Sequence, residues 1–298
     1  MELVRAFGKL RQKGWKPKRT IVFASWAAEE YGLLGSYEWV SDKLSKIMER
    51  MVGVINTDYC STGPIAKPQA SPALKDIVKE ALQHASDPSV GNDYYPTPRK
   101  QRNYYDFWKE WYNKDNKEGD PLTEPKINLL GSGSDHAPFA FFAGIPAVNL
   151  RFKDDTKRYK GVGQYPLYHT GYETFYLVDN ITDPGYKIHK TCAQTSMHMM
   201  LNLADSLILP YNLNHLSEEM ISSIEKFKTS GVESLLEENG ATLKHLDEAV
   251  KEFDKACSTY MYNLKSTEKK NPIRLRMIND QMMQLDRVFI IPAGLPDR

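Results

Sequence analysis

Two adjacent glutamates, Glu29 and Glu30, are the first residues whose type and position suggest chemistry. They follow the apolar run TIVFASW at 20–26 and precede Gly32 and Gly35. Ligands of open α/β sheets bind at the carboxyl ends of strands, so this pair lies where a site is expected. Because neighbouring residues in extended backbone point in different directions, one carboxylate can bind a metal while the other acts as general base. The alternative is two glutamates at a helix start, favoured by its dipole.

Two further residues, Asp58 and His169, have metal-ligand chemistry. Asp58 ends the next predicted strand, VGVINTD, on the same edge of the sheet, although an Asp after a strand also serves as a turn or cap residue. His169 lies in YPLYHTGYE, where flanking aromatic residues are typical of a half-apolar pocket around a ligand. The alternative for His169 is a histidine packed in an aromatic cluster. Any metal bound at these residues would be held by carboxylates and imidazole.

A fourth segment, LGSGSDHAPF, places Gly131, Gly133, Asp135 and His136 at a predicted junction between a loop and a helix. Backbone amides at such a junction can face a ligand. The alternative is a helix cap formed by Ser134 or Asp135.

The composition narrows the class of protein. The 298 residues carry 39 Lys and Arg against 38 Asp and Glu, a formal charge of +1, so no global field favours nucleic acid or an anionic membrane. With 41% hydrophobic and 26% charged residues the chain is globular. It has neither an apolar run of about 20 residues nor a signal-peptide core at its amino terminus. Its three cysteines are too few and too far apart for a disulfide framework or a Cys-rich zinc site.

The pattern of apolar residues predicts an α/β fold that would position these side chains. A buried strand at 20–26, a helix at 36–50 and a strand at 52–56 form a βαβ unit. Additional strands are expected at 147–152 and near 127–130, with helices at 2–13, 72–84, 136–143 and 185–208. Residues 86–128 are predicted to be an irregular excursion around an aromatic helix, YYDFWKEWY. Together these elements predict a sheet covered by helices.

From about residue 209 the predicted strands end. Residues 214–290 contain three helical patterns, which indicate a second, helical domain. The chain therefore divides into residues 1–208 and 209–298. The helices of the second part carry more apolar surface than one domain edge can bury, so we expect two-fold self-association.

Several segments together resemble the glutamate carboxypeptidase II, or N-acetylated alpha-linked acidic dipeptidase, family. They are RTIVFASWAAEEYGLLGSYEW, INTD, LGSGSDHAPFAFFAGIP, YPLYHTGYET and NPIRLRMINDQMMQLDRVFIIPAGLPDR, in the same order over nearly the whole chain. The resemblance implies a di-zinc exopeptidase acting on peptides. It also implies a partial three-layer zinc-exopeptidase sheet, followed by part of a helical transferrin-receptor-like domain that forms a homodimer.

The resemblance also implies roles for the site residues. Glu29 matches the general base, Glu30 and His169 match ligands of one zinc, and Asp58 matches a ligand of the other. Two bound zinc ions would lower the pKa of a shared water while Glu29 takes its proton and passes it to the leaving amine.

Substrate contacts are expected from the same comparison. Tyr168 matches a tyrosine whose hydroxyl faces the substrate, and Gly133 matches a backbone contact in the cleft. Where acid-selective members carry two arginines, this chain has Asn149 and Arg151, and Ser134 replaces an asparagine. We therefore expect a broader, dipeptidase-like specificity to compete with a preference for acidic residues.

The chain also departs from the family. The other two zinc ligands, a His and a bridging Asp, lie upstream of the segment that matches residues 1–11, and a Lys-Tyr pair that holds the substrate carboxylate lies beyond residue 298. The protease-associated domain is missing as well. We therefore expect a fragment or a truncated gene model that is inactive as given, with His136 and Asp135 the first substitutes to examine.

Two other functions compete with a peptidase. A receptor-like binding protein on the same fold has lost metal ligands, whereas every ligand position and the base that this chain can display are intact. A cyclase on the same fold is disfavoured by the helical dimerisation segment. Family members are typically type II membrane proteins with extracellular catalytic domains, and Asn180 begins a glycosylation sequon. The chain as written shows no anchor, so its location stays open.

Overall fold

The computed structural model of the chain describes residues 1–89, 102–117, 119–158, 165–267 and 271–291. A small sheet lies at its centre, with strand order β1 (Val54–Asn56), β4 (Ala147–Asn149), β3 (Gln69–Ala70). β1 runs parallel to β4, with Val54 opposite Ala147, and β3 is antiparallel to β4. A second, two-stranded sheet pairs β2 (Ile65–Ala66) with β5 (Phe152–Lys153).

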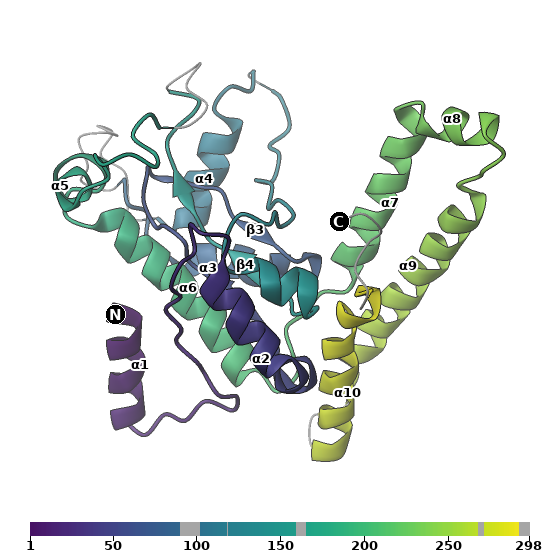
Figure 1. Cartoon of the computed structure of the whole chain (residues 1–298), viewed down its shortest axis with the longest axis horizontal. Coiled ribbons are helices and arrows are strands. Elements are labelled where there is room, and N and C mark those ends of the chain that lie inside the picture. Colours follow the sequence, from purple (N-terminus) through teal and green to yellow (C-terminus); the bar gives the residue numbers. More distant parts are fainter. Residues whose placement is uncertain (90–101, 118, 159–164, 268–270, 292–298) are drawn as a thin grey trace.

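Helices cover both faces of this sheet (Figure 1). The alternation of side chains along β1 explains the division. Ile55 packs into the large cluster with α3 (Lys75–His84) and α6 (Lys187–Asp205), whereas Val54 packs into a smaller cluster with α2 (Leu34–Arg50). A π-helix at Pro138–Phe142 contributes Phe139 to the smaller cluster.

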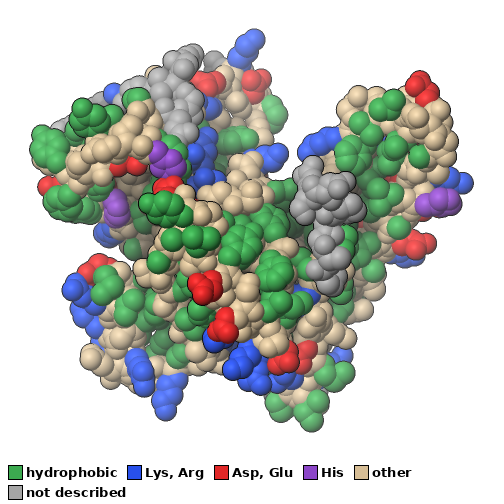
Figure 2. Space-filling view, viewed as in Figure 1, with side chains coloured by type: hydrophobic (Ala, Val, Ile, Leu, Met, Phe, Trp, Pro, Cys, Tyr) green, Lys and Arg blue, Asp and Glu red, His purple; other side chains and the backbone are tan. Residues whose placement is uncertain are grey.

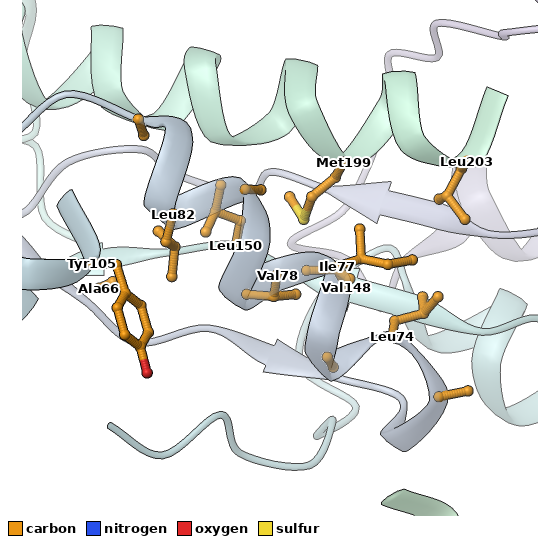
Figure 3. Packing of buried hydrophobic residues seen from close by; sticks show 14 of the residues in the cluster. Ala66, Leu74, Ile77, Val78, Leu82, Tyr105, Val148, Leu150, Met199 and Leu203 are labelled. Carbon is orange, nitrogen blue, oxygen red and sulfur yellow. The ribbon is translucent and has the colours of Figure 1, made fainter. Parts of the chain in front are cut away.

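The large cluster forms the main core (Figure 3). On α3, Val78 and Leu82 are four residues apart and therefore share one face, which is fully buried. On α6, Met199 and Leu203 repeat the same spacing, and both side chains point from the helix toward the sheet. Burying a side chain of this size stabilises the fold by about 1.5 to 3 kcal/mol.

The aromatic helix α4 (Tyr104–Asn113) adds to this core. Asn103 caps its first turn by accepting a hydrogen bond from the backbone N–H of Asp106. Tyr104 is fully buried, and its hydroxyl donates to the Pro64 carbonyl at 2.7 Å while accepting from the Ala66 N–H. α4 thereby holds the strand β2 that follows the Asp58 loop.

The remaining helices lie at the two ends of the chain. The segment that follows α1 (Glu2–Gln12) is attached to the end of α6, because the Trp15 indole N–H donates to Asp205 at 2.8 Å. After α6 come α7 (Asn214–Thr229), α8 (Val232–Glu238), α9 (Lys244–Lys265) and α10 (Pro272–Gln284), which ends in a 3₁₀ turn at Arg287–Phe289. α7 and α9 pack on each other and project away from the sheet (Figure 1).

Some predicted elements differ in the structure. The predicted strand at 20–26 is not formed, so the βαβ unit lacks its first strand, and the strand near 127–130 is reduced to one bridge between Asn128 and Gln69. The described residues of 214–267 and 271–290 form four α-helices, where three were predicted. The molecule is rich in helix with small sheets, and the fuller three-layer sheet stays a prediction. Residues 90–101 and 118 of the predicted excursion, and 292–298 of the last family-like segment, lie outside the described residues.

The cysteines also depart from the sequence prediction, which found no disulfide framework. Cys60 and Cys192 form a disulfide with their Cα atoms 5.8 Å apart, across a sequence separation of 132 residues. Cys257 is buried and free. No described helix is long and apolar enough to cross a membrane.

Candidate functional site

Four segments that are distant in the sequence meet at one cavity of about 920 Å³. They are the turn before α2, the loop after β1, the loop before the π-helix and the aromatic loop before α5 (Phe175–Leu177). Its wall includes the predicted residues Glu29, Glu30, Asp58, Gly133, Tyr168 and His169. Figure 2 shows hydrophobic side chains gathered around α5, where Phe175 is 74% exposed.

Glu30 and His169 form the tightest pair in this wall. The Glu30 Oε1 lies 2.9 Å from the His169 Nε2, and both side chains are at least half exposed. His169 adopts a left-handed φ of 59°, and its backbone N–H donates to the Glu173 carboxylate at 3.0 Å. The Tyr168 ring stacks on the imidazole, with the ring centroids 3.8 Å apart. The imidazole is therefore held by the Tyr168 ring and by Glu30, with Nε2 directed at a carboxylate, while Glu173 holds the backbone.

Glu29 lies in a tight turn that leads into α2. Its carbonyl accepts hydrogen bonds from the backbone N–H groups of Gly32 and Leu33. A Cβ atom at Gly35 would lie 2.6 Å from the Ala27 carbonyl oxygen, so only glycine allows the turn to close. Partial removal from water, followed by the nearby negative charges, raises the pKa of Glu29. A raised pKa suits a group that must hold a proton during a reaction.

Asp58 follows β1 and is exposed, like Glu30, whereas Glu29 is partly buried. Partial loss of water around its carboxyl group raises the pKa of Asp58, while Ser134 and the positive charge of Arg151 oppose the increase. Ser134 itself is buried, and its hydroxyl accepts a hydrogen bond from the Asn56 amide at 2.8 Å.

Three of the residues predicted to contact substrate do not line this cavity: Ser134, Asn149 and Arg151. Asn149 is buried in β4. The side chains of Asn149 and Arg151 both donate to the Gln69 amide oxygen. Their substrate roles stay predictions, whereas Tyr168 and Gly133 do lie in the wall.

Asp135 and His136 are buried beside Ser134 and outside the cavity wall. The His136 Nε2 lies 2.6 Å from the Gly131 carbonyl, so this nitrogen carries the proton and donates. The His136 Nδ1 and one Asp135 carboxyl oxygen are buried without a hydrogen-bond partner. Burial lowers the pKa of His136. Both residues therefore have free ligand atoms, although neither is directed into the cavity by the contacts seen.

The wall fits zinc only in part. Carboxylate and imidazole are suitable ligands, and Glu30 with His169 offers one of each. Among the described residues, however, no group of three or more His, Cys, Asp or Glu side chains is arranged to hold a metal ion. The described wall could hold one ion through two protein ligands, with Asp58 as an additional carboxylate nearby.

Three features of the site were not predicted from the sequence: Glu173, His189 and the Cys60–Cys192 disulfide. Glu173 holds the backbone of His169, and His189 lines the cavity with its Nδ1 2.7 Å from the Asp183 carboxylate. Asp183 is buried and also accepts from the backbone N–H groups of Ile188 and His189, as a helix-capping acid does. Because Asp183 lies just before α6, its role as a helix-capping acid could have been predicted from the sequence. Nothing in the sequence marked Glu173 or the disulfide of Cys60.

The cavity is acidic. Its described wall contains the carboxylates of Glu29, Glu30, Asp58 and Glu173 and no Lys or Arg. Such a wall attracts cations, either a metal ion or a protonated amino group.

Two family models match parts of this chain. Residues 1–187 match the model of Peptidase family M28, and residues 236–298 match the transferrin receptor-like dimerisation domain. Aminopeptidase NAALADL1 of Rattus norvegicus is 33% identical over 301 residues, covering 100% of this chain and 39% of the relative. Glutamate carboxypeptidase 2 homolog of Caenorhabditis elegans is 32% identical over 309 residues, covering 99% of this chain and 38% of the relative. The chain thus spans about two fifths of the length of these relatives.

Proposed function

Because the chain belongs to peptidase family M28 and carries a transferrin receptor-like dimerisation domain, we propose that it forms part of a zinc-dependent exopeptidase. The observation that carries this proposal is the cavity in which Glu29, Glu30, Asp58 and His169 meet from separate segments. The names of the relatives, which include both carboxypeptidases and an aminopeptidase, support hydrolysis of peptides.

In the proposed reaction each residue has a separate task. Glu30 and His169 would hold one zinc and Asp58 the other, and bound zinc would lower the pKa of water and polarise the peptide carbonyl. Glu29 accepts the proton of the attacking water and returns it to the leaving amine, for which its raised pKa is suited. Tyr168, stacked on His169, presents its hydroxyl at the wall where substrate would bind.

We propose that the two remaining family ligands, a His and a bridging Asp, come from parts of the protein other than these 298 residues. The absence of a three-ligand group among the described residues supports this proposal. It follows that the isolated chain binds zinc weakly at one site and shows no measurable turnover.

Two specificities remain in competition. A carboxypeptidase or dipeptidase agrees with most of the named relatives and with the family resemblance. An aminopeptidase is favoured by the acidic wall, because carboxylates pair with the amino terminus of a peptide, and by the name of one group of relatives.

The location of the protein is also a proposal. The disulfide between Cys60 and Cys192 favours maturation in an oxidising compartment, as expected for an extracellular catalytic domain. Glycosylation at Asn180 would agree with that location.

One assay decides between these functions. The natural protein, captured with an antibody raised against this chain, is tested on dipeptides that are free, acetylated at the amino end or amidated at the carboxyl end. We expect hydrolysis that a chelator abolishes and zinc restores. A carboxypeptidase tolerates acetylation, and an aminopeptidase tolerates amidation. A zinc-saturated protein that cleaves none of these peptides supports the alternative, a receptor-like binding homologue.

A further inference from the structure

The disulfide joins the site to the core. Cys60 is two residues beyond Asp58 and lines the same cavity. Cys192 lies on α6 and is buried at 1% exposure. The bond therefore connects the loop that carries Asp58 to a core helix distant in the sequence.

The loop has few other attachments. It is anchored at one end by Asn56, whose carbonyl accepts from the Leu150 N–H at 3.0 Å, and at the other by the Thr62 N–H, which donates to Phe152 at 3.1 Å. Between these anchors, the backbone of residues 57–61 makes no hydrogen bond to another backbone group of the described chain. The disulfide is thus the main restraint on the middle of the loop.

α6 is a rigid anchor for this restraint. It packs along α3, and Met199 and Leu203 lie in the main core. Thr191, next to Cys192, donates its hydroxyl to the Ser86 carbonyl at 2.8 Å, which joins α6 to the end of α3. A loop fixed to such a helix loses conformational freedom before any cation arrives.

We propose that the Cys60–Cys192 disulfide is a positioning cross-link that holds the Asp58 carboxylate in place for cation binding. This inference rests on the proposed function, because it takes Asp58 to face a cation. Asp58 lines the same cavity as the paired side chains of Glu30 and His169, so in the isolated chain it is the additional carboxylate for an ion held by that pair. An ordered loop gives this carboxylate a fixed position, which strengthens binding without adding a contact.

The first test is a cycle of variants in the 298-residue chain. Non-reducing peptide mapping first establishes the Cys60–Cys192 link, and its absence overturns the proposal. Zinc affinity is then measured for wild type, Cys60→Ala/Cys192→Ala, Asp58→Asn and the triple variant. We expect removal of the disulfide to weaken binding roughly tenfold, the usual effect of losing a positioning partner. In the Asp58→Asn background the same removal should have no further effect.

Two controls separate positioning from general stability. Leu82→Ala creates a cavity in the core away from the site and lowers the melting temperature to a similar degree, yet should leave zinc affinity unchanged. Cys257→Ala removes the free thiol and should leave zinc affinity unchanged. If the double variant does not fold, Cys60→Ala alone removes the disulfide and leaves the buried Cys192 side chain in place. Equal loss of affinity in Leu82→Ala would contradict a positioning role.

A measurement without zinc makes the outcome independent of the proposed function. Backbone order parameters of residues 57–61 are measured by NMR with and without the disulfide. We expect a rigid loop, about 0.85, in wild type and less than about 0.6 in the variant. If Asp58→Asn leaves zinc affinity unchanged, the role of Asp58 in the proposed function is wrong. The restraint by the disulfide is still tested, because the order parameters do not depend on zinc. An equally ordered loop in both proteins overturns the inference.

Discussion

Glu29 and Glu30 are neighbours in the chain, yet the structure gives their carboxyl groups different surroundings. Glu30 pairs with the imidazole of His169 at 2.9 Å, as a metal ligand beside another ligand would. Glu29 has no such partner in the described wall, and its pKa is raised by partial burial and by nearby carboxylates. These different surroundings agree with the proposed roles, metal binding for Glu30 and proton transfer for Glu29.

This difference predicts how two matched variants behave. Glu30→Gln should weaken zinc binding by at least about tenfold, because it removes a ligand. Glu29→Gln should leave zinc binding unchanged and lower the peptidase kcat of the zinc-loaded natural protein by about 10² to 10⁴, the usual contribution of a general base. Calorimetry on both variants separates the roles. Equal loss of zinc in the two proteins would show that the pair is assigned wrongly.

The residue types of the site were predictable, but their contacts were not. Glu30 and His169 could be named from the motifs that contain them, and the structure brings them together. The partner of Asn149 and Arg151 could not be predicted, because both side chains donate hydrogen bonds to Gln69, which lies on a different strand. A pair such as Cys60 and Cys192 depends on the packing of α6 against the sheet, which no local pattern reports.

At the scale of elements, helices agreed with prediction better than strands. α2, α3 and α9 form where the spacing of apolar residues places them, since a helix satisfies its own backbone hydrogen bonds. A strand needs a neighbour. The apolar segment 20–26 lies unpaired, and in the described chain its backbone takes part in no hydrogen bond of a sheet. The apolar pattern of residues 20–26 favours a strand, but a strand forms only where a neighbouring strand supplies hydrogen-bond partners.

The unpaired segment should make the isolated chain prone to aggregate. Val22 is 66% exposed in this segment, which offers both apolar side chains and free backbone groups to another chain. Val22→Lys should raise the temperature at which light scattering increases on heating. Val4→Lys adds the same charge to an exposed position on α1 and serves as the control. An equal gain from both variants would attribute the effect to net charge rather than to the segment.

The contact between α3 and α7 should depend on pH. The two His215 nitrogens each lie 2.8 Å from a carboxylate, Asp76 on α3 and Glu218 on α7. Since both partners only accept, the ring donates twice when it is protonated, and the hydrogen bond to Asp76 raises the pKa of His215. A raised pKa means that this stabilisation is complete below the ordinary value of 6.5 and is lost as pH rises through the folded value. Lys79 and the Lys75–Glu219 ion pair lie beside this contact.

A pH series of melting temperatures tests this contact. Replacing His215 with Gln should cost roughly 1 kcal/mol near pH 6, or about 2 to 4 °C, because the partner carboxylates are largely exposed. The difference should vanish by about pH 9. His245→Gln, at a fully exposed position beside Glu248, should show no such trend. A difference that persists unchanged at high pH would contradict a protonated His215.

For the whole molecule, the main consequence is association through the last helices. Residues 236–298 match a dimerisation domain, and α10 and the turn after it carry exposed apolar side chains, including Met277 at 58% and Val288 at 70%. We therefore predict a dimer at micromolar concentration in sedimentation experiments. Met277→Glu should shift the equilibrium to monomer, whereas Leu122→Glu, at a position that is 70% exposed and outside these helices, should not. A wild-type protein that is monomeric would contradict this role.

The central claim is that Glu30 and His169 form a zinc site in the cavity, and anomalous diffraction from zinc-soaked crystals tests it most directly. We predict one peak about 2.0 to 2.2 Å from a Glu30 carboxyl oxygen and from the His169 Nε2. The peak should be absent in Glu30→Gln crystals and present in Glu29→Gln crystals. A cavity without zinc, or a peak that does not contact these two residues, would contradict the account.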